Sequence, residues 1–222
     1  MSKIVNFGEE VDGYAIPVLN EREIRAAAGL LFLMMFISVM NVVFNENFLL
    51  LKYAVTIFLV DIVIRVFINP RYAPTLIIGR MIVKNQVPEY VGAQQKKFAW
   101  KVGVVLASIF FIFTVILNSY SPITGLVCLA CLLFLFFESV FGICLGCKFY
   151  PLFHKDKPQL CPGEACEVKD RQEIQKTSGA QLMIVLGFIA FIVLLTFMVN
   201  DFYSIAPYDM FGLDTAKSSN IE

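Results

Sequence analysis

The residues best suited to chemistry are the cysteines, and four of the six lie in one short stretch. Cys144 and Cys147 end a long apolar segment, and Cys161 and Cys166 follow in a polar loop. The spacing C-x2-C-x13-C-x4-C supplies four soft ligands that suit tetrahedral zinc or iron. The first pair by itself is also close enough to form a reversible disulfide. Sulfur chemistry is therefore expected in this stretch.

The leading hypothesis uses only Cys144 and Cys147 as a catalytic thiol pair and requires no cofactor. A thiolate at the C-terminal end of a helix is opposed by the helix dipole. We expect Gly146 to end the helix and Lys148 to stabilise the thiolate of Cys147. The alternatives are a zinc or iron site built from all four cysteines, and unreactive thiols.

Composition predicts what kind of protein carries these residues. The 222-residue chain is 58% hydrophobic, contains 22 Phe and is only 16% charged, whereas soluble domains are about 25% charged. Several windows reach the roughly 18 apolar residues that indicate a membrane-spanning helix. The first 25 residues lack the basic start of a cleavable signal peptide, so we expect the first helix to stay in place. The sequence predicts an all-α, polytopic membrane protein.

The apolar segments predict five transmembrane helices, arranged as two helical hairpins plus a C-terminal helix. Polar turns at 45–47 and 118–122 separate the members of each hairpin. The helix of the first span is expected to begin before the membrane, because Asn20 and Glu23 have the spacing of a helix cap. The expected segments are a cytoplasmic arm 1–25, a four-helix core 26–147 with spans 26–44, 48–68, 99–117 and 122–145, a cysteine-containing loop 148–176, a fifth span 177–200 and a periplasmic tail 201–222.

The distribution of basic residues predicts the orientation. The arm and the segments 69–101 and 146–176 hold 15 of the 18 Lys and Arg residues. Loops rich in Lys and Arg stay in the cytoplasm, so both the N-terminus and the four-cysteine loop are expected there and the C-terminus outside. A permanent structural disulfide is not expected in that reducing compartment. The expected partners are the lipid bilayer and a cytoplasmic thiol or sulfur-transfer protein, and no nucleic acid.

The cytoplasmic segment 69–101 is expected to lie at the membrane surface. Pro70 and Pro74 end the second span. Residues 75–87 predict an interfacial helix with Arg80 and Lys84 turned toward lipid headgroups. The run 96–101, which combines basic and aromatic residues around Trp100, predicts an interfacial anchor.

Charged residues inside the spans predict a second candidate site. Asp61 and Arg65 are four residues apart on one helix face, and Glu138 lies in the fourth span. Buried charges in membrane helices often mark pathways or partner contacts, and the plainer alternative is an ion pair that only fixes helix packing. The expected partners of Glu138 are Arg25, Arg65 or Lys101.

The remaining candidates have simpler interpretations. Cys128 and Cys131 lie about 24 Å along a helix from Cys144, so the two pairs are not expected to share a site and we interpret the earlier pair as packing residues. His154 is interpreted as a solvated loop residue rather than a ligand.

An ordered set of motifs resembles a bacterial integral membrane family catalogued as domain of unknown function 4395. The set is Asn20-Glu-Arg-x-x-Arg25, Asp61-x-x-x-Arg65, Lys97-Phe98-Ala99 and Phe141-Gly-x-Cys-x-Gly-Cys147. The resemblance covers roughly residues 15–155 and implies a four-helix core in a bacterial inner membrane, with no assigned activity. Cys161, Cys166 and the fifth span lie outside it, which favours the thiol pair as the shared feature.

Three functional hypotheses follow. The first is disulfide exchange, or carriage of sulfane sulfur, by Cys144 and Cys147 at the cytoplasmic face. The second is a non-enzymatic zinc or iron site that organises the loop and a partner surface. The third is a small-anion carrier lined by Arg25, Arg65 and Lys101.

Overall fold

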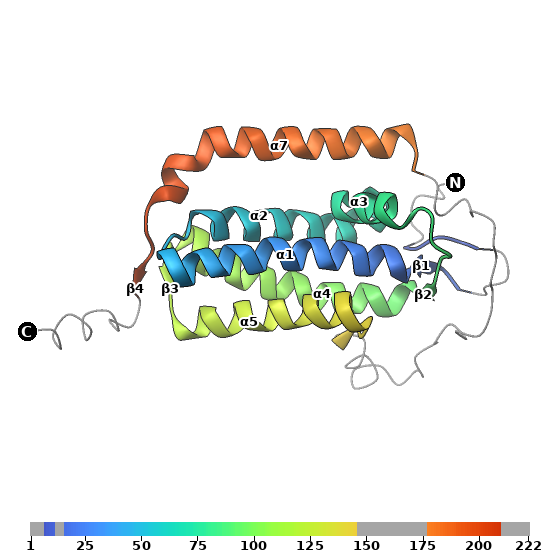
Figure 1. Cartoon of the computed structure of the whole chain (residues 1–222), viewed down its shortest axis with the longest axis horizontal. Helices are drawn as coiled ribbons and strands as arrows, with labels where there is room; N and C mark the ends of the chain where they lie inside the picture. The colour runs from blue at the N-terminus through green and yellow to red at the C-terminus, as the bar shows by residue number, and fades with distance from the viewer. Residues whose placement is uncertain (1–6, 12–15, 146–176, 210–222) are drawn as a thin grey trace, which may run out of the picture.

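A bundle of four antiparallel helices forms the body of the structure, a computed structural model that describes residues 7–11, 16–145 and 177–209. A fifth long helix lies along the outside of the bundle, next to α2 and α3 (Figure 1). The bundle helices are α1 (Glu21–Asn45), α2 (Leu49–Val63), α4 (Ala93–Phe111) and α5 (Pro122–Phe136), and the outer helix is α7 (Gly179–Ser204).

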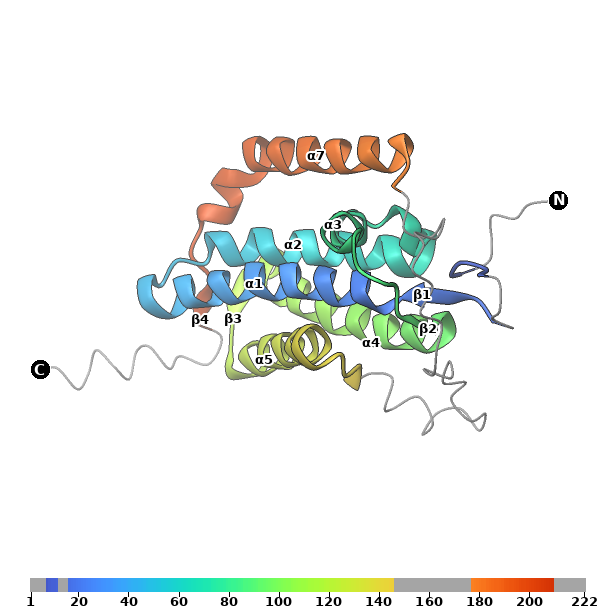
Figure 2. The ribbon, with the colours of Figure 1, turned by 45° about the vertical axis from the view of Figure 1, so that its right-hand side comes forward.

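Shorter elements extend and connect these helices. Three bundle helices continue as one turn of π-helix: η1 (Ile64–Ile68) after α2, η3 (Ile112–Ile116) after α4 and η4 (Phe137–Phe141) after α5. The 3-10 turn η2 (Pro70–Tyr72) and the short helix α3 (Pro74–Val83) follow η1. Seen from a second direction, α3 still lies between α1 and the start of α7 (Figure 2).

Local sequence explains where the helices begin and end. The side chain of Asn20 accepts a hydrogen bond from the backbone of Arg22 and donates one to Glu23, so the predicted helix cap at Asn20 is confirmed. Ser121 caps α5 through Thr124, with Pro122 in the first turn. Asn69 and Ala73 are extended before their prolines, as expected.

Four of the five predicted spans are long and apolar enough to cross a membrane. They correspond to residues 21–45, 93–116, 122–141 and 179–204. The predicted span 48–68 forms a helix over α2 and η1 but is not among the four, because its 15 and 5 residues include Lys52, Asp61 and Arg65. All three side chains are buried against other parts of the protein.

Two small sheets join the ends of the bundle and were not predicted. Antiparallel β1 (Val18–Asn20) and β2 (Tyr90–Gly92) pair beside the start of α1. At the opposite end, parallel β3 (Ser119–Tyr120) and β4 (Tyr208–Asp209) connect the second hairpin to the segment after α7 (Figure 1). Strands this short carry little periodicity, so the sequence did not indicate them.

The predicted surface roles of Arg80, Lys96 and Trp100 are wrong. Arg80 on α3 is 6% exposed and forms ion pairs with Glu9 and Glu23, so it does not face lipid headgroups; Lys84 is exposed, as expected. Lys96 and Trp100 are also buried, at 1% and 6%. Because the first turns of α4 lie inside the bundle, their polar groups find partners there rather than at an interface.

Candidate functional site

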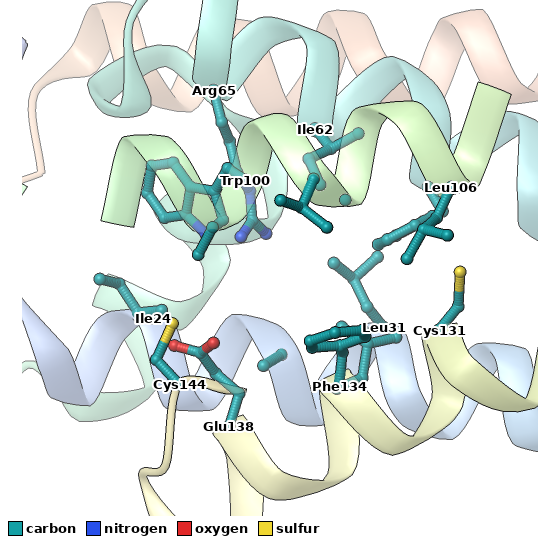
Figure 3. A pocket seen from close by; sticks show the side chains of 16 residues that line it. Ile24, Leu31, Ile62, Arg65, Trp100, Leu106, Cys131, Phe134, Glu138 and Cys144 are labelled. Atoms are coloured by element: carbon teal, nitrogen blue, oxygen red, sulfur yellow. The ribbon is translucent and has the colours of Figure 1, made fainter. Parts of the chain in front are cut away.

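A small cavity lies inside the bundle, at the end where α5 finishes. It is lined by residues from all four bundle helices and their ends, and its volume is about 70 Å³. Most of the wall is apolar. The chemically distinctive lining residues are Arg65, Trp100, Cys131, Glu138 and Cys144 (Figure 3).

The end of α5 turns Cys144 into this cavity. Gly142 adopts a left-handed conformation with φ +64° and ends the helical segment, so the prediction that Gly146 ends it is wrong. The guanidinium of Arg25 packs on Gly142, 3.3 Å from where a Cβ would lie. Arg25 also donates from Nη2 to the carbonyl of Val140, at 3.2 Å. The Phe-Gly-x-Cys motif therefore works as a helix stop that presents the cysteine.

Cys144 is disulfide-bonded. Cys128 and Cys131 are free and buried. Cys147, Cys161 and Cys166 fall in the segment 146–176, outside the described residues, together with Lys148 and His154. The proposed roles of these five residues stay predictions.

Glu138 has a partner that was not predicted. Its Oε1 lies 2.5 Å from Nζ of Lys96, which also lies 2.8 Å from Oε2 of Glu21. The ammonium of Lys96 is buried between the two carboxylates, whereas Lys101 is exposed. The expectation that Arg25, Arg65 or Lys101 pairs with Glu138 is therefore wrong, since these contacts bring α1, α4 and η4 together around Lys96.

The predicted Asp61–Arg65 ion pair is present. Arg65 Nε lies 2.7 Å from Asp61 Oδ2, and both side chains are buried. Asp61 also accepts hydrogen bonds from the backbone N–H and the hydroxyl of Thr75, at 3.0 and 2.7 Å. The guanidinium of Arg65 lies 5.3 Å from the ring centroid of Trp100, a cation–π contact at the cavity wall.

A neighbouring polar network holds the N-terminal segment on the bundle. Arg80 donates from Nε to Glu23 and from Nη2 to Glu9, at 3.1 and 3.2 Å. Burial raises the pKa of Glu9 above its usual value, and the nearby Arg80 and Arg71 oppose that rise. This network does not line the cavity with Cys144 and is best explained as structural.

The second cysteine pair is buried among helix side chains. Cys128 packs in the apolar core next to Met35, Val55 and Phe110, which agrees with a packing role. Cys131, however, lines the same cavity as Cys144. The cavity extends along α5, so one residue of the earlier pair borders it, and the expectation that the two pairs form separate sites stays a prediction.

The predicted anion-carrier residues do not converge on one site. Of the three, Arg65 lines the cavity, Arg25 packs on Gly142 and Lys101 is exposed. Among the residues that the structure describes, no group of three or more His, Cys, Asp or Glu side chains could hold a metal ion. The four-cysteine metal hypothesis is not tested by this, since three of its ligands lie elsewhere.

Sequence reasoning missed three residues of the site: Glu21, Lys96 and Trp100. Lys96 and Trp100 are four residues apart on α4 and face the same way, which was the available signal. Glu21 lies in the first turn of α1, where acidic residues are common for electrostatic reasons alone. The sequence positions of these three residues do not show which residues they contact in the folded protein.

Comparison with known protein families matches residues 19–155 to the family described as Domain of unknown function (DUF4395). The chain belongs to the DUF4395 family. The matched region contains the four-helix bundle, the cavity and the Phe-Gly-x-Cys turn, and α7 lies outside it. Searches of curated proteins and of solved structures gave no match.

Proposed function

We propose that this DUF4395 protein carries out thiol–disulfide chemistry at the cytoplasmic face of a bacterial inner membrane, with Cys144 and Cys147 as the reacting pair. The observation that carries the proposal is the state and position of Cys144. It is disulfide-bonded, and it lines a cavity together with the charged side chains of Arg65 and Glu138. A cysteine that serves only for packing does not need a disulfide bond, and the buried Cys128 and Cys131 are free.

The proposed compartment supports an exchangeable bond rather than a permanent one. In the proposed orientation the turn at Gly142 faces the cytoplasm, because 15 of the 18 basic residues belong to the segments on that side. Thiol systems there keep structural cysteines reduced, and the cytosolic disulfides that persist are mostly transient or catalytic. Carriage of sulfane sulfur on Cys144 is the closest alternative, since it uses the same thiol.

The position of Cys144 relative to α5 also favours reactivity. A cysteine in the last helical turn would face the partial negative charge of the helix end, which disfavours a thiolate. Cys144 instead follows Gly142, after the helical hydrogen bonding has ended.

The experiment is a set of single Cys-to-Ser variants, trapped in intact cells by acid quenching and alkylation. Cys144→Ser and Cys147→Ser should each abolish reversible oxidation, whereas Cys161→Ser and Cys166→Ser should have mild effects. Cys128→Ser is the matched control, since Cys128 is buried and does not line the cavity.

Metal analysis of the same variants after purification distinguishes the four-cysteine metal site from the thiol pair. A structural site loses its metal when any one ligand is removed. Stoichiometric zinc or iron that disappears in Cys161→Ser would overturn the thiol-pair proposal. Thiols that all stay reduced and unreactive, with no metal bound, would overturn both.

A further inference from the structure

Glu138 is the acidic residue among the side chains that line the cavity with Cys144. Both residues line it, and Figure 3 shows the carboxylate of Glu138 beside the Cys144 sulfur. They come from different local structures, since Glu138 belongs to η4 and Cys144 follows the left-handed turn at Gly142. The turn at Gly142 separates the two residues along the chain, yet both side chains reach the same cavity.

Charged groups from three other elements surround Glu138. Lys96 on α4 contacts Oε1, and Glu21 on α1 binds the same ammonium. Arg65 faces the cavity from the α2 side, where Asp61 and Thr75 hold its Nε and Nη2. Glu138 thus lines the cavity with its carboxylate held by Lys96.

The size of the cavity determines which molecules fit between Glu138 and Cys144. A buried water needs about 10–15 Å³ of such space and two to four polar partners. About 70 Å³ is present, lined by Arg65, Glu138 and Cys144. The space accommodates a few waters that link these groups, and it is too small for a drug-sized ligand, whose pockets are about 300–1,000 Å³.

We propose that Glu138 is the proton acceptor and donor for Cys144, and that Lys96 is the positioning residue that aims it. This inference rests on the thiol–disulfide function proposed above and adds a catalytic residue to it. A general base must lie within hydrogen-bond reach of the thiol, directly or through one water. In this proposal a water in the shared cavity makes this link, since the cavity has room for one.

In the proposed exchange, the substrate disulfide is the oxidant for Cys144. The thiol proton of reduced Cys144 moves to the carboxylate of Glu138, and the thiolate attacks one sulfur of the substrate disulfide. A new S–S bond forms to Cys144 as the old one breaks, and the departing thiolate takes a proton from Glu138 or from water. The substrate is reduced, and Cys144 is oxidised to a mixed disulfide that its partner cysteine then resolves.

The test compares three variants of the full-length protein in membranes after reduction. The readout is the rate at which Cys144 forms a mixed disulfide with a small aromatic disulfide reagent, followed by peptide mass spectrometry from pH 5 to 9. Glu138→Gln should slow the reaction about 100-fold at pH 7 and make its rate depend steeply on pH. Glu138→Asp should recover most of the rate, because the carboxylate is kept.

Glu23→Gln is the matched control. It makes the same chemical change on another buried, ion-paired carboxylate, but Glu23 pairs with Arg80 and does not line the cavity. Its pH profile should resemble that of the unmodified protein. If Glu138→Gln reacts with an unchanged profile, or Glu23→Gln slows as much as Glu138→Gln, the role of Glu138 is refuted while the thiol function stands. If Cys144 of the unmodified protein does not exchange at all, the proposed function itself fails.

Discussion

The buried Asp61–Arg65 pair allows a quantitative test of what holds the site together. Asp61 is 0% exposed, and its carboxylate accepts hydrogen bonds from Arg65 and twice from Thr75. Arg65→Gln removes the only cation of this cluster and leaves the carboxylate charged in a low-dielectric interior. Removing one partner of a buried pair typically costs about 3–5 kcal/mol. We expect the free energy of unfolding to fall by that amount.

The reverse variant should be milder. In Asp61→Asn the cation of Arg65 keeps its contact with the face of Trp100, and it borders a cavity that admits water. Both features stabilise an unpaired guanidinium, whereas the buried Asp61 has neither. The double variant, with Asp61→Asn and Arg65→Gln, should recover much of the lost stability, because a neutral pair carries no stranded charge.

The assay is unfolding in mixed micelles with increasing sodium dodecyl sulfate, followed by tryptophan fluorescence. Trp100 is the single tryptophan and lies at the pair, so it reports directly on this region. A double-mutant cycle gives the coupling energy, with about 1–3 kcal/mol expected for groups in contact. Additive effects, or equal losses in both single variants and the double variant, would refute the ion-pair account.

Other predictions concern the turn, the opposite end of the bundle and the topology. Gly142→Ala should cost about 1–2 kcal/mol for the left-handed conformation and displace the guanidinium of Arg25, which would slow disulfide formation by Cys144 measured by alkylation trapping. Lys52→Met removes the hydrogen bond from Nζ to the carbonyl of Ile205, 2.6 Å long, and should speed proteolysis after α7 while the bundle stays folded. A phosphatase reporter fused after Glu222 should be active in the periplasm, and cytoplasmic activity would overturn the proposed orientation.

The sequence by itself determined the helical layout. Uncharged apolar runs of this length leave the backbone no partners in a bilayer except its own, so they must be helices. Asn20 and Ser121 set helix starts through local hydrogen bonds. The Asp61–Arg65 pair was also predictable, because residues four apart on a helix face the same way. Each of these features depends on neighbours within a few residues.

The ion pairs around the site join residues far apart in the sequence, which local sequence patterns do not predict. Lys96 and Glu138 are 42 residues apart, and Arg80 and Glu23 are 57 apart. Several cations were available to each carboxylate, and the rotation and depth of each helix decided which one it met. Charged residues predicted to lie at the membrane surface therefore turned out to be buried ion-pair partners.

The position of Cys144 could not be predicted from the sequence for the same reason. The sequence spacing identified Cys144 as a candidate. However, a span predicted to run through residue 145 puts Cys144 inside the helix. The structure ends the helical segment at Gly142, where Arg25 of α1 packs against the turn. A glycine adopts a left-handed conformation at low cost, and several glycines could have ended this segment. The packing of α1 against the end of α5 selected Gly142, and thereby brought Cys144 beside Glu138.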